Sequence, residues 1–181
     1  MTGKSGPAPD NYSSRMPNES SLDALNAAEP DRAERELLAC CAARRWAGEL
    51  VVRRPYLDVE TLLTVSDGIF AELGWVDVEQ ALAAHPRIGE PAAGDGQEAR
   101  WSRAEQSAAT GAAEELRAGN LAYEERFGRV FLICATGRAA GEILAELRQR
   151  LGNDEETERA VVREELRRIV GLRLRKLVGS T

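Results

Sequence analysis

The chain has 181 residues, of which 43% are hydrophobic and 30% are charged, and its net charge is −6. This length suits one domain with a sizeable core, and the negative charge argues against a nucleic-acid-binding surface. No apolar run is long enough to span a bilayer. The odd cysteine set of Cys40, Cys41 and Cys134 suggests neither a disulfide framework nor a metal site. We therefore expect a soluble cytoplasmic protein without nucleic-acid or membrane partners.

The chain opens with a polar segment, residues 1–19, which is rich in Gly, Pro, Ser and Asn and lacks an apolar period. We expect it to be a flexible tail. The rest of the chain, 20–181, is expected to form one domain made almost wholly of helices. Asp31 can cap the first clear helix, which the apolar spacing carries to about Val52.

Further helices are predicted by apolar spacing, capping residues and breakers. They cover about 58–73, 77–85, 102–116, 120–127, 139–151 and 155–178. The apolar run 130–135 has no convincing strand to pair with, and periodicity leaves it either buried and extended or the start of a helix. The prediction is an all-α, single-domain bundle of roughly seven to nine helices.

His85 is the only histidine of the chain and stands where a short predicted helix meets Pro86. A residue before proline disfavours the helical backbone, so the chain should leave its helix here. The imidazole titrates near neutral pH without assistance and could reach a pocket from this exit. The alternative is a hydrogen-bonded structural histidine.

Arg173 interrupts an apolar stripe of the last predicted helix. The stripe consists of Val162, Leu166, Ile169 and Leu177 at helical spacing. A guanidinium on such a face should meet an acidic residue, backbone carbonyls or an anionic ligand, because an unpartnered buried charge is costly. Alternatively its stem lies on the core while its head reaches water.

Glu105 stands three residues after Ser102 at a predicted helix start. The pair fits a capping box, in which each side chain satisfies a free backbone amide. Glu105 also heads a small apolar face made by Ala109, Ala112 and Leu116, where a carboxylate would tend to hold a proton or pair with a cation. Free amides at this helix start could also hold an anionic or carbonyl oxygen of a substrate.

Motifs for zinc, phosphate, dinucleotides and a serine nucleophile are absent from the sequence. An enzyme built on this chain would rely on an imidazole, a carboxylate and a guanidinium, with no apparent cofactor or metal. These groups suit proton transfer around a small anion that can itself absorb negative charge.

Several short motifs occur in a defined order along the chain. They are Cys40-Cys41 followed by Trp46, Arg54-Pro55, His85-Pro86-Arg87-Ile88-Gly89, Ser102-Arg103-Ala104-Glu105-Gln106, Tyr123-Glu124-Glu125-Arg126-Phe127-Gly128, Phe131-Leu132-Ile133-Cys134-Ala135 and Leu172-Arg173-Leu174. Over roughly residues 22–178 the chain resembles the 2-oxo-4-hydroxy-4-carboxy-5-ureidoimidazoline (OHCU) decarboxylases. The order and separation of independent motifs make the resemblance far more specific than any one of them.

The resemblance implies an all-α carboxy-lyase that is usually a homodimer and needs neither a metal nor an organic cofactor. Its small-molecule substrate would be OHCU, which loses carbon dioxide to give (S)-allantoin in the last step from urate to allantoin. Bacterial members of the family act in the cytoplasm. The residues alone allow two other interpretations. The protein could be a cofactor-free hydrolase or isomerase of another cyclic ureide, or an inactive helical interaction module.

The resemblance also assigns roles within the site. His85 would be the catalytic acid or base, Glu105 the catalytic carboxylate, and Arg173 the anchor of a carbonyl or carboxylate oxygen. The substrate-binding residues implied by the same motifs are Pro86, Ser102, Arg103, Ala104, Gln106, Phe131, Leu132, Ile133, Cys134, Ala135 and Ile169. The segment 131–135 would border the ligand largely through its backbone.

Overall fold

The computed structural model describes residues 21–89 and 106–179, with the side chains of 106–112 left out. This part of the chain contains eight α-helices and no strand, which confirms the expected all-α fold. None of these helices is both long and apolar enough to cross a membrane. The predicted tail, 1–19, lies outside the described residues.

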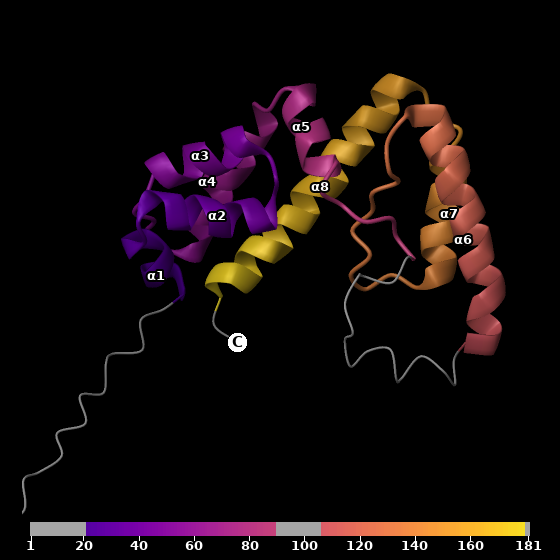
Figure 1. Cartoon of the computed structure of the whole chain (residues 1–181), viewed down its shortest axis with the longest axis horizontal. Coiled ribbons are helices and arrows are strands. Elements are labelled where there is room, and N and C mark those ends of the chain that lie inside the picture. The colour runs from indigo at the N-terminus through magenta and orange to yellow at the C-terminus, as the bar shows by residue number, and fades with distance from the viewer. Residues whose placement is uncertain (1–20, 90–105, 180–181) are drawn as a thin grey trace, which may run out of the picture.

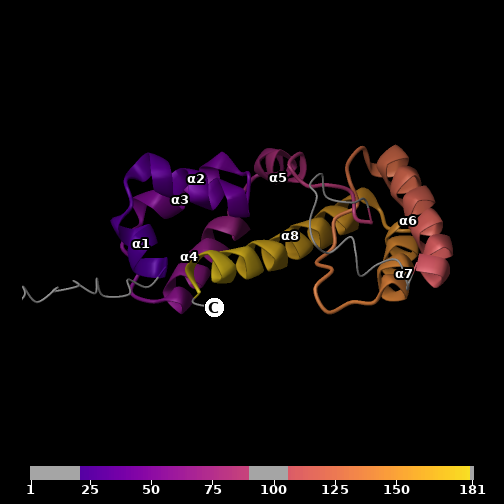
Figure 2. The ribbon, with the colours of Figure 1, turned by 60° about the horizontal axis from the view of Figure 1, so that its bottom comes forward.

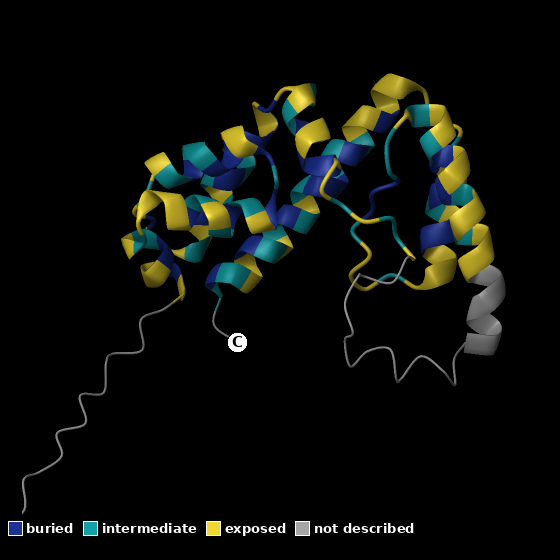
Figure 3. Cartoon of the chain, in the orientation of Figure 1, coloured by how far each residue is buried: buried dark blue, intermediate teal, exposed yellow. Residues whose placement is uncertain are grey.

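The longest helix, α8 (Glu155–Val178), joins two groups of helices. In Figures 1 and 2 it runs diagonally from the group α1–α4 at its C-terminal end toward α6 and α7 at its other end. Asp154 begins the helix by accepting the Thr157 amide at 2.8 Å. Its buried residues occur along most of its length (Figure 3), because successive turns pack against different neighbours.

The first group comprises α1 (Ser21–Ala27), α2 (Pro30–Cys40), α3 (Arg44–Val52) and α4 (Val59–Ala71). Helices α1, α2 and α4 each pack against α8. Trp46 is fully buried among them and donates from its indole to the Ser66 hydroxyl at 3.1 Å. The Arg54 guanidinium donates to two carbonyls, Leu25 O at 2.6 Å and Ala28 O at 2.7 Å, and so secures the end of α1.

The second group comprises α6 (Gln106–Phe127) and α7 (Ala140–Arg150), which pack side by side, and α5 (Trp75–Leu82) leads toward it. Its core consists of Tyr123, Phe131, Ile133, Ile143, Leu144 and Leu147. The segment 130–135, between α6 and α7, is neither helix nor strand in the structure. Of the two conformations left open, the helix start is therefore wrong. Phe131, Leu132 and Ile133 are buried, whereas Val130 is half-buried and Ala135 is exposed.

Several helix boundaries were predicted incorrectly. The helix α2 begins at Pro30, so Asp31 does not cap it, and α5 spans Trp75–Leu82 and not 77–85. The helix expected over 31–52 is interrupted at 41–43, where Cys41 adopts an extended backbone and α3 starts anew. The amide of Arg44 is capped from α5, by Gln80 Oε1 at 2.9 Å, which no local pattern shows. Conversely, the two helices expected over 102–127 form one continuous helix across Gly119 within the described part. The short helix α1 was not foreseen at all.

Candidate active site

A cavity of about 390 Å³ lies between the loop after α5, the segment that joins α6 to α7, and the C-terminal half of α8. Three stretches line it: residues 85–89, residues 131–136, and the α8 residues Ile169, Leu172 and Arg173. The volume is in the range of small-molecule sites, and the lining combines apolar walls with a few polar groups. His85 and Arg173 thus come together although they lie 88 positions apart in the sequence.

His85 reaches the cavity because α5 ends at Leu82, one tight turn before it. The backbone amide of His85 still donates to Leu82 O at 2.9 Å, in a final tight turn. Its ring nitrogen Nδ1 lies 2.8 Å from Ala81 O, and since a carbonyl only accepts, Nδ1 carries the proton. Nε2 is therefore the basic nitrogen, and it is buried without a hydrogen-bond partner among the described residues.

The charge state of His85 follows from its surroundings. Burial lowers the pKa of this imidazole below its usual value, and the positive charge of Arg173 lowers it further, against the opposing bond to Ala81 O. The ring is consequently neutral at pH 7. A neutral imidazole with a free Nε2 can accept a proton from a bound hydroxyl.

Arg173 finds its partner in the first helix group. Its Nη1 donates to Cys40 O at 3.1 Å, at the last residue of α2. The C-terminus of a helix favours a cation, so α2 holds the guanidinium at the cavity. This is the only hydrogen bond of Arg173 within the described ranges, which leaves most of its five N–H donors available to an anionic or carbonyl oxygen.

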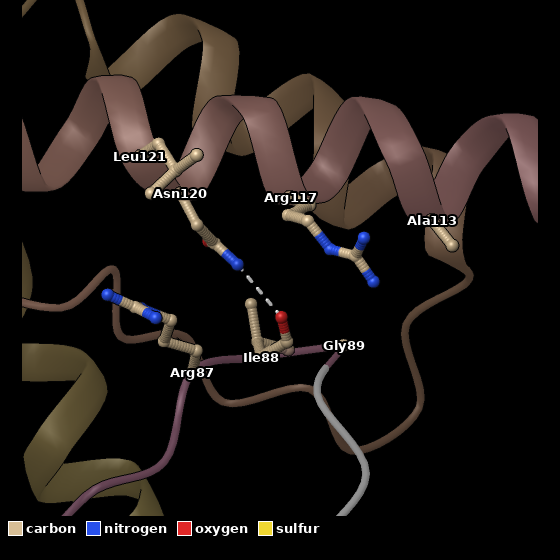
Figure 4. Close-up of a pocket in the computed structure, with 7 residues that line it drawn as sticks. All are labelled: Arg87, Ile88, Gly89, Ala113, Arg117, Asn120 and Leu121. Carbon is tan, nitrogen blue, oxygen red and sulfur yellow. Dashed lines mark hydrogen bonds between the residues drawn. The ribbon is translucent and has the colours of Figure 1, made fainter.

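The segment that carries His85 is fixed to α6 on its far side. Arg87 binds Glu124 through two hydrogen bonds, of 2.5 and 2.7 Å, in a bidentate pair. Asn120, one turn earlier on α6, donates to Ile88 O at 2.9 Å. Figure 4 shows this amide reaching from the helix to the Ile88 carbonyl, beside the small hollow that Arg87 and Arg117 border. The loop that delivers His85 is therefore held at two successive residues.

The comparison with protein families decides what kind of protein this is. The family model described as OHCU decarboxylase matches residues 26–175. The chain belongs to the OHCU decarboxylase family. The resemblance expected from the motifs is thereby confirmed.

Relatives agree with this assignment. A uric acid degradation bifunctional protein, TTL, of Arabidopsis thaliana is 33% identical over 154 residues, which are 81% of this chain and 48% of that protein. The chain therefore spans about half the length of this relative. A 2-oxo-4-hydroxy-4-carboxy-5-ureidoimidazoline decarboxylase of Amia calva is 32% identical over 143 residues, 76% of this chain and 79% of that protein.

Solved structures share the fold. One, of an OHCU decarboxylase in the presence of (S)-allantoin, has a TM-score of 0.68 and 26% identity, covering 84% of this chain and 100% of the other. A second, of an (S)-allantoin synthase, has a TM-score of 0.63 at 16% identity, covers 87% of this chain and 54% of the other, and supports the fold alone.

Most residues expected in an OHCU decarboxylase site surround the cavity. Besides His85 and Arg173, the lining includes Pro86, Phe131, Leu132, Ile133, Cys134, Ala135 and Ile169. Glu105, Ser102, Arg103 and Ala104 lie outside the described residues, and Gln106 opens α6 with its side chain undescribed. The structure thus brings two of the three expected catalytic side chains together, while the roles of all three stay predictions.

The sequence reasoning missed two buried residues that bind the cavity wall from behind, and it also missed Thr136, which lines the cavity. Arg150 and Glu165 are buried, and each binds a backbone group of the segment 131–136. One signal was present: Glu158 and Glu165 are seven residues apart on α8, on the same face as Val162 and next to apolar positions. Carboxylates at such positions need hydrogen-bond or charge partners, so the spacing indicates buried polar contacts on this face of α8.

Proposed function

We propose that this chain decarboxylates OHCU to (S)-allantoin and carbon dioxide. The observation that carries the proposal is the pairing, at one cavity of small-molecule size, of a neutral imidazole with a free Nε2 and a guanidinium with free donors. This pairing occurs in a chain of the OHCU decarboxylase family. The names of its relatives, one of uric acid degradation and one an OHCU decarboxylase, point to the same reaction.

The substrate can supply its own electron sink. The bond that breaks joins the carboxylate carbon to the ring carbon that carries the hydroxyl. As carbon dioxide leaves, the electron pair of this bond forms a carbon–carbon double bond, and the adjacent carbon–nitrogen double bond opens onto its nitrogen, which takes up one proton. The resulting enol then loses its hydroxyl proton and gains a proton at the carbon that carries the ureido group. That carbon becomes the stereocentre of allantoin.

The described side chains fit separate steps of this reaction. Arg173 would hold a carbonyl or carboxylate oxygen, and because its Nη1 is already tied to Cys40 O, the remaining donors are pre-oriented. His85 Nε2 would accept the hydroxyl proton. Phe131 and Ile133 are almost fully buried beside the cavity, and a water-poor wall disfavours a compact carboxylate relative to a dispersed transition state.

Protonation of one face would set the S configuration. We assign this step to His85 or to Glu105, which the family resemblance makes the catalytic carboxylate. Substituting His85→Ala and Glu105→Gln separately, and following carbon dioxide release and product handedness together, assigns the proton donor. Normal release and normal handedness in His85→Ala would remove the histidine from the mechanism.

The activity itself is tested with OHCU generated freshly from urate, because the compound decays spontaneously to racemic allantoin. Circular dichroism reads (S)-allantoin, and carbon dioxide release is measured in parallel. We expect one carbon dioxide per (S)-allantoin, faster than the spontaneous reaction. Racemic product at the spontaneous rate would reject the proposal, and turnover without carbon dioxide would favour a hydrolase or isomerase.

The anchor role of Arg173 has a matched control on the same helix. Arg173→Met should reduce kcat/KM by roughly 10²-fold or more, the usual effect of removing a charge-stabilising donor. Arg175 lies two residues further on and binds Glu60 at 2.8 Å on the exposed surface, so Arg175→Met should leave turnover within about twofold. Equal effects of the two substitutions would contradict the assignment.

We further propose that the enzyme acts in the cytoplasm as a homodimer, with 20–181 as its domain and 1–19 as a flexible tail. The support is the family resemblance together with the polar composition of the first residues. Light scattering during size-exclusion chromatography measures the oligomeric state, and a monomeric mass at working concentration would contradict the dimer.

A further inference from the structure

One wall of the cavity is a stretch of backbone that lacks regular secondary structure. Residues 131–136 all line the cavity, yet none belongs to a helix or a strand. In such a segment no ladder of backbone hydrogen bonds determines which way each amide and carbonyl points. Its conformation must therefore be set by individual partners. Among the described residues, two side chains bind its backbone, both from helices behind the wall.

The first partner is Glu165 of α8. Its Oε2 accepts the Cys134 amide at 2.7 Å, and the residue is 6% exposed. Its Oε1 accepts from Arg168 at 3.1 Å and lies 3.5 Å from the Arg138 guanidinium. A turn follows Cys134, in which the Arg138 amide donates to Ala135 O at 3.0 Å. The Glu165 carboxylate thus contacts Cys134 before this turn and Arg138 at its end.

The second partner is Arg150 at the end of α7. Its Nη1 donates to Leu132 O at 2.8 Å, and its guanidinium lies 4.6 Å from the centre of the Phe131 ring. Glu158 neutralises the charge with hydrogen bonds of 2.6 and 2.9 Å. Arg150 is 1% exposed, so solvent does not compete for the Leu132 carbonyl.

The two partners act on backbone groups two residues apart, the carbonyl of 132 and the amide of 134. Between them lies Ile133, whose own amide and carbonyl have no hydrogen bond within the described part of the chain. Rotation of either neighbouring peptide plane would change the direction of these unpaired groups. Holding the neighbours therefore orients the part of the wall that a flat, polar ring would meet.

We propose that Glu165, assisted by Arg150, is a positioning residue of the reaction: its carboxylate holds the Cys134 amide and thereby fixes the backbone wall against which the substrate ring is oriented. The inference rests on the proposed decarboxylase function. Glu165 lies behind the wall and does not line the cavity. Its loss should therefore disturb ring placement more than the acid–base chemistry of His85.

The experiment compares three variants in the full chain. Glu165→Leu removes the acceptor of the Cys134 amide while keeping a side chain of similar size. Glu165→Gln keeps a carbonyl oxygen that can accept from the same amide. Glu164→Leu is the matched control. Glu164 is the neighbouring carboxylate on α8, and it is half exposed. It accepts from Arg167 at 2.9 Å and from Arg168 at 3.0 Å, close to the 3.1 Å between Glu165 and Arg168.

We expect Glu165→Leu to raise KM roughly tenfold or more and to lower the excess of the S product, because a charge-assisted hydrogen bond that orders the wall is lost. The acidic limb of its pH profile should stay in place, because His85 keeps its bond to Ala81 O. Glu165→Gln should regain most of the KM and the S excess. Glu164→Leu should stay within about twofold of the unmodified chain.

Hydrogen exchange supplies a readout that does not depend on turnover. The amide of Cys134 should exchange slowly in the unmodified chain and in Glu165→Gln, and much faster in Glu165→Leu. If Glu165→Leu fails to fold, as far-ultraviolet circular dichroism would show, Glu165→Ser with the same exchange measurement replaces it. Unchanged KM, product handedness and Cys134 exchange in a folded variant without the carboxylate would overturn the proposal.

The two proposals fail in different ways. An unmodified chain that forms racemic allantoin at the spontaneous rate removes the decarboxylase function, and with it the positioning role. An active unmodified chain whose Glu165→Leu variant matches the Glu164→Leu control leaves the function intact and rejects only the positioning role.

Discussion

Arg150→Met should destabilise the protein strongly, because it breaks an ion pair that is almost completely buried. Arg150 and Glu158 have side chains 1% and 0% exposed, and their closest contact is 2.6 Å. Removing one member of a buried pair leaves the other charge uncompensated, which typically costs about 3–5 kcal/mol. The Leu132 carbonyl also loses its donor, which adds to the cost.

Two contacts limit this loss. Glu158 keeps the Tyr123 hydroxyl as a donor, and Asn153 Nδ2 at 2.8 Å. We therefore expect a decrease of about 4 kcal/mol in the free energy of unfolding. For a chain of this size that corresponds to a fall of roughly 8–16 °C in Tm.

Urea and thermal denaturation, followed by circular dichroism, measure the change. Arg148→Met is the matched control: it lies on the same helix, and its pair with Glu115 is 63% and 55% exposed, so its loss should cost less than about 1 kcal/mol. In Arg150→Met/Glu158→Gln the loss should be smaller than the sum of the single losses, since the two charges compensate each other. A single-variant loss below about 1 kcal/mol, or strict additivity, would refute the reasoning.

Three further predictions concern the site and the packing behind it. Because burial lowers the pKa of His85, the acidic limb of the kcat/KM profile should have its midpoint below pH 6.5, and a midpoint above 6.5 would contradict this. The contribution of His85 to folding stability should be constant above pH 6.5 and should decrease below it, because the unfolded chain then binds the proton first. Gly119→Ala should lower the free energy of unfolding by about 1–3 kcal/mol, because its added methyl would lie 2.1 Å from a Leu147 methyl carbon across the α6–α7 contact. Urea titration measures the change, and an unchanged midpoint would show that Leu147 moves aside without cost. Glu124→Gln should lower the free energy of unfolding by less than about 1 kcal/mol, since the ion pair with Arg87 is partly exposed. It should nevertheless raise KM, because the loop that carries His85 is held less firmly. An unchanged KM would show that the pair does not hold this loop.

Local sequence determined the elements whose signals lie within a few residues. The helix that begins after Asp154 was predicted with both of its ends, because the cap and the apolar spacing agree over its whole length. The proline after His85 likewise predicted that the chain has left its helix at this residue, although α5 itself ends earlier, at Leu82. The misplaced charge of Arg173 marked the face of α8 that meets the cavity, since a guanidinium in an apolar stripe requires a partner.

The partners of these residues were decided only by the tertiary structure. Arg173 binds a carbonyl 133 positions away, at a helix end that exists because the chain breaks at 41–43. Glu165 meets the Cys134 amide from 31 positions away, so the stripe of α8 could show that this carboxylate needed a partner but not which one. The physical reason is the same in each case: capping and periodicity act between neighbours along the chain, whereas a buried charge is satisfied by whichever donor or acceptor the packing of distant helices brings within hydrogen-bond distance.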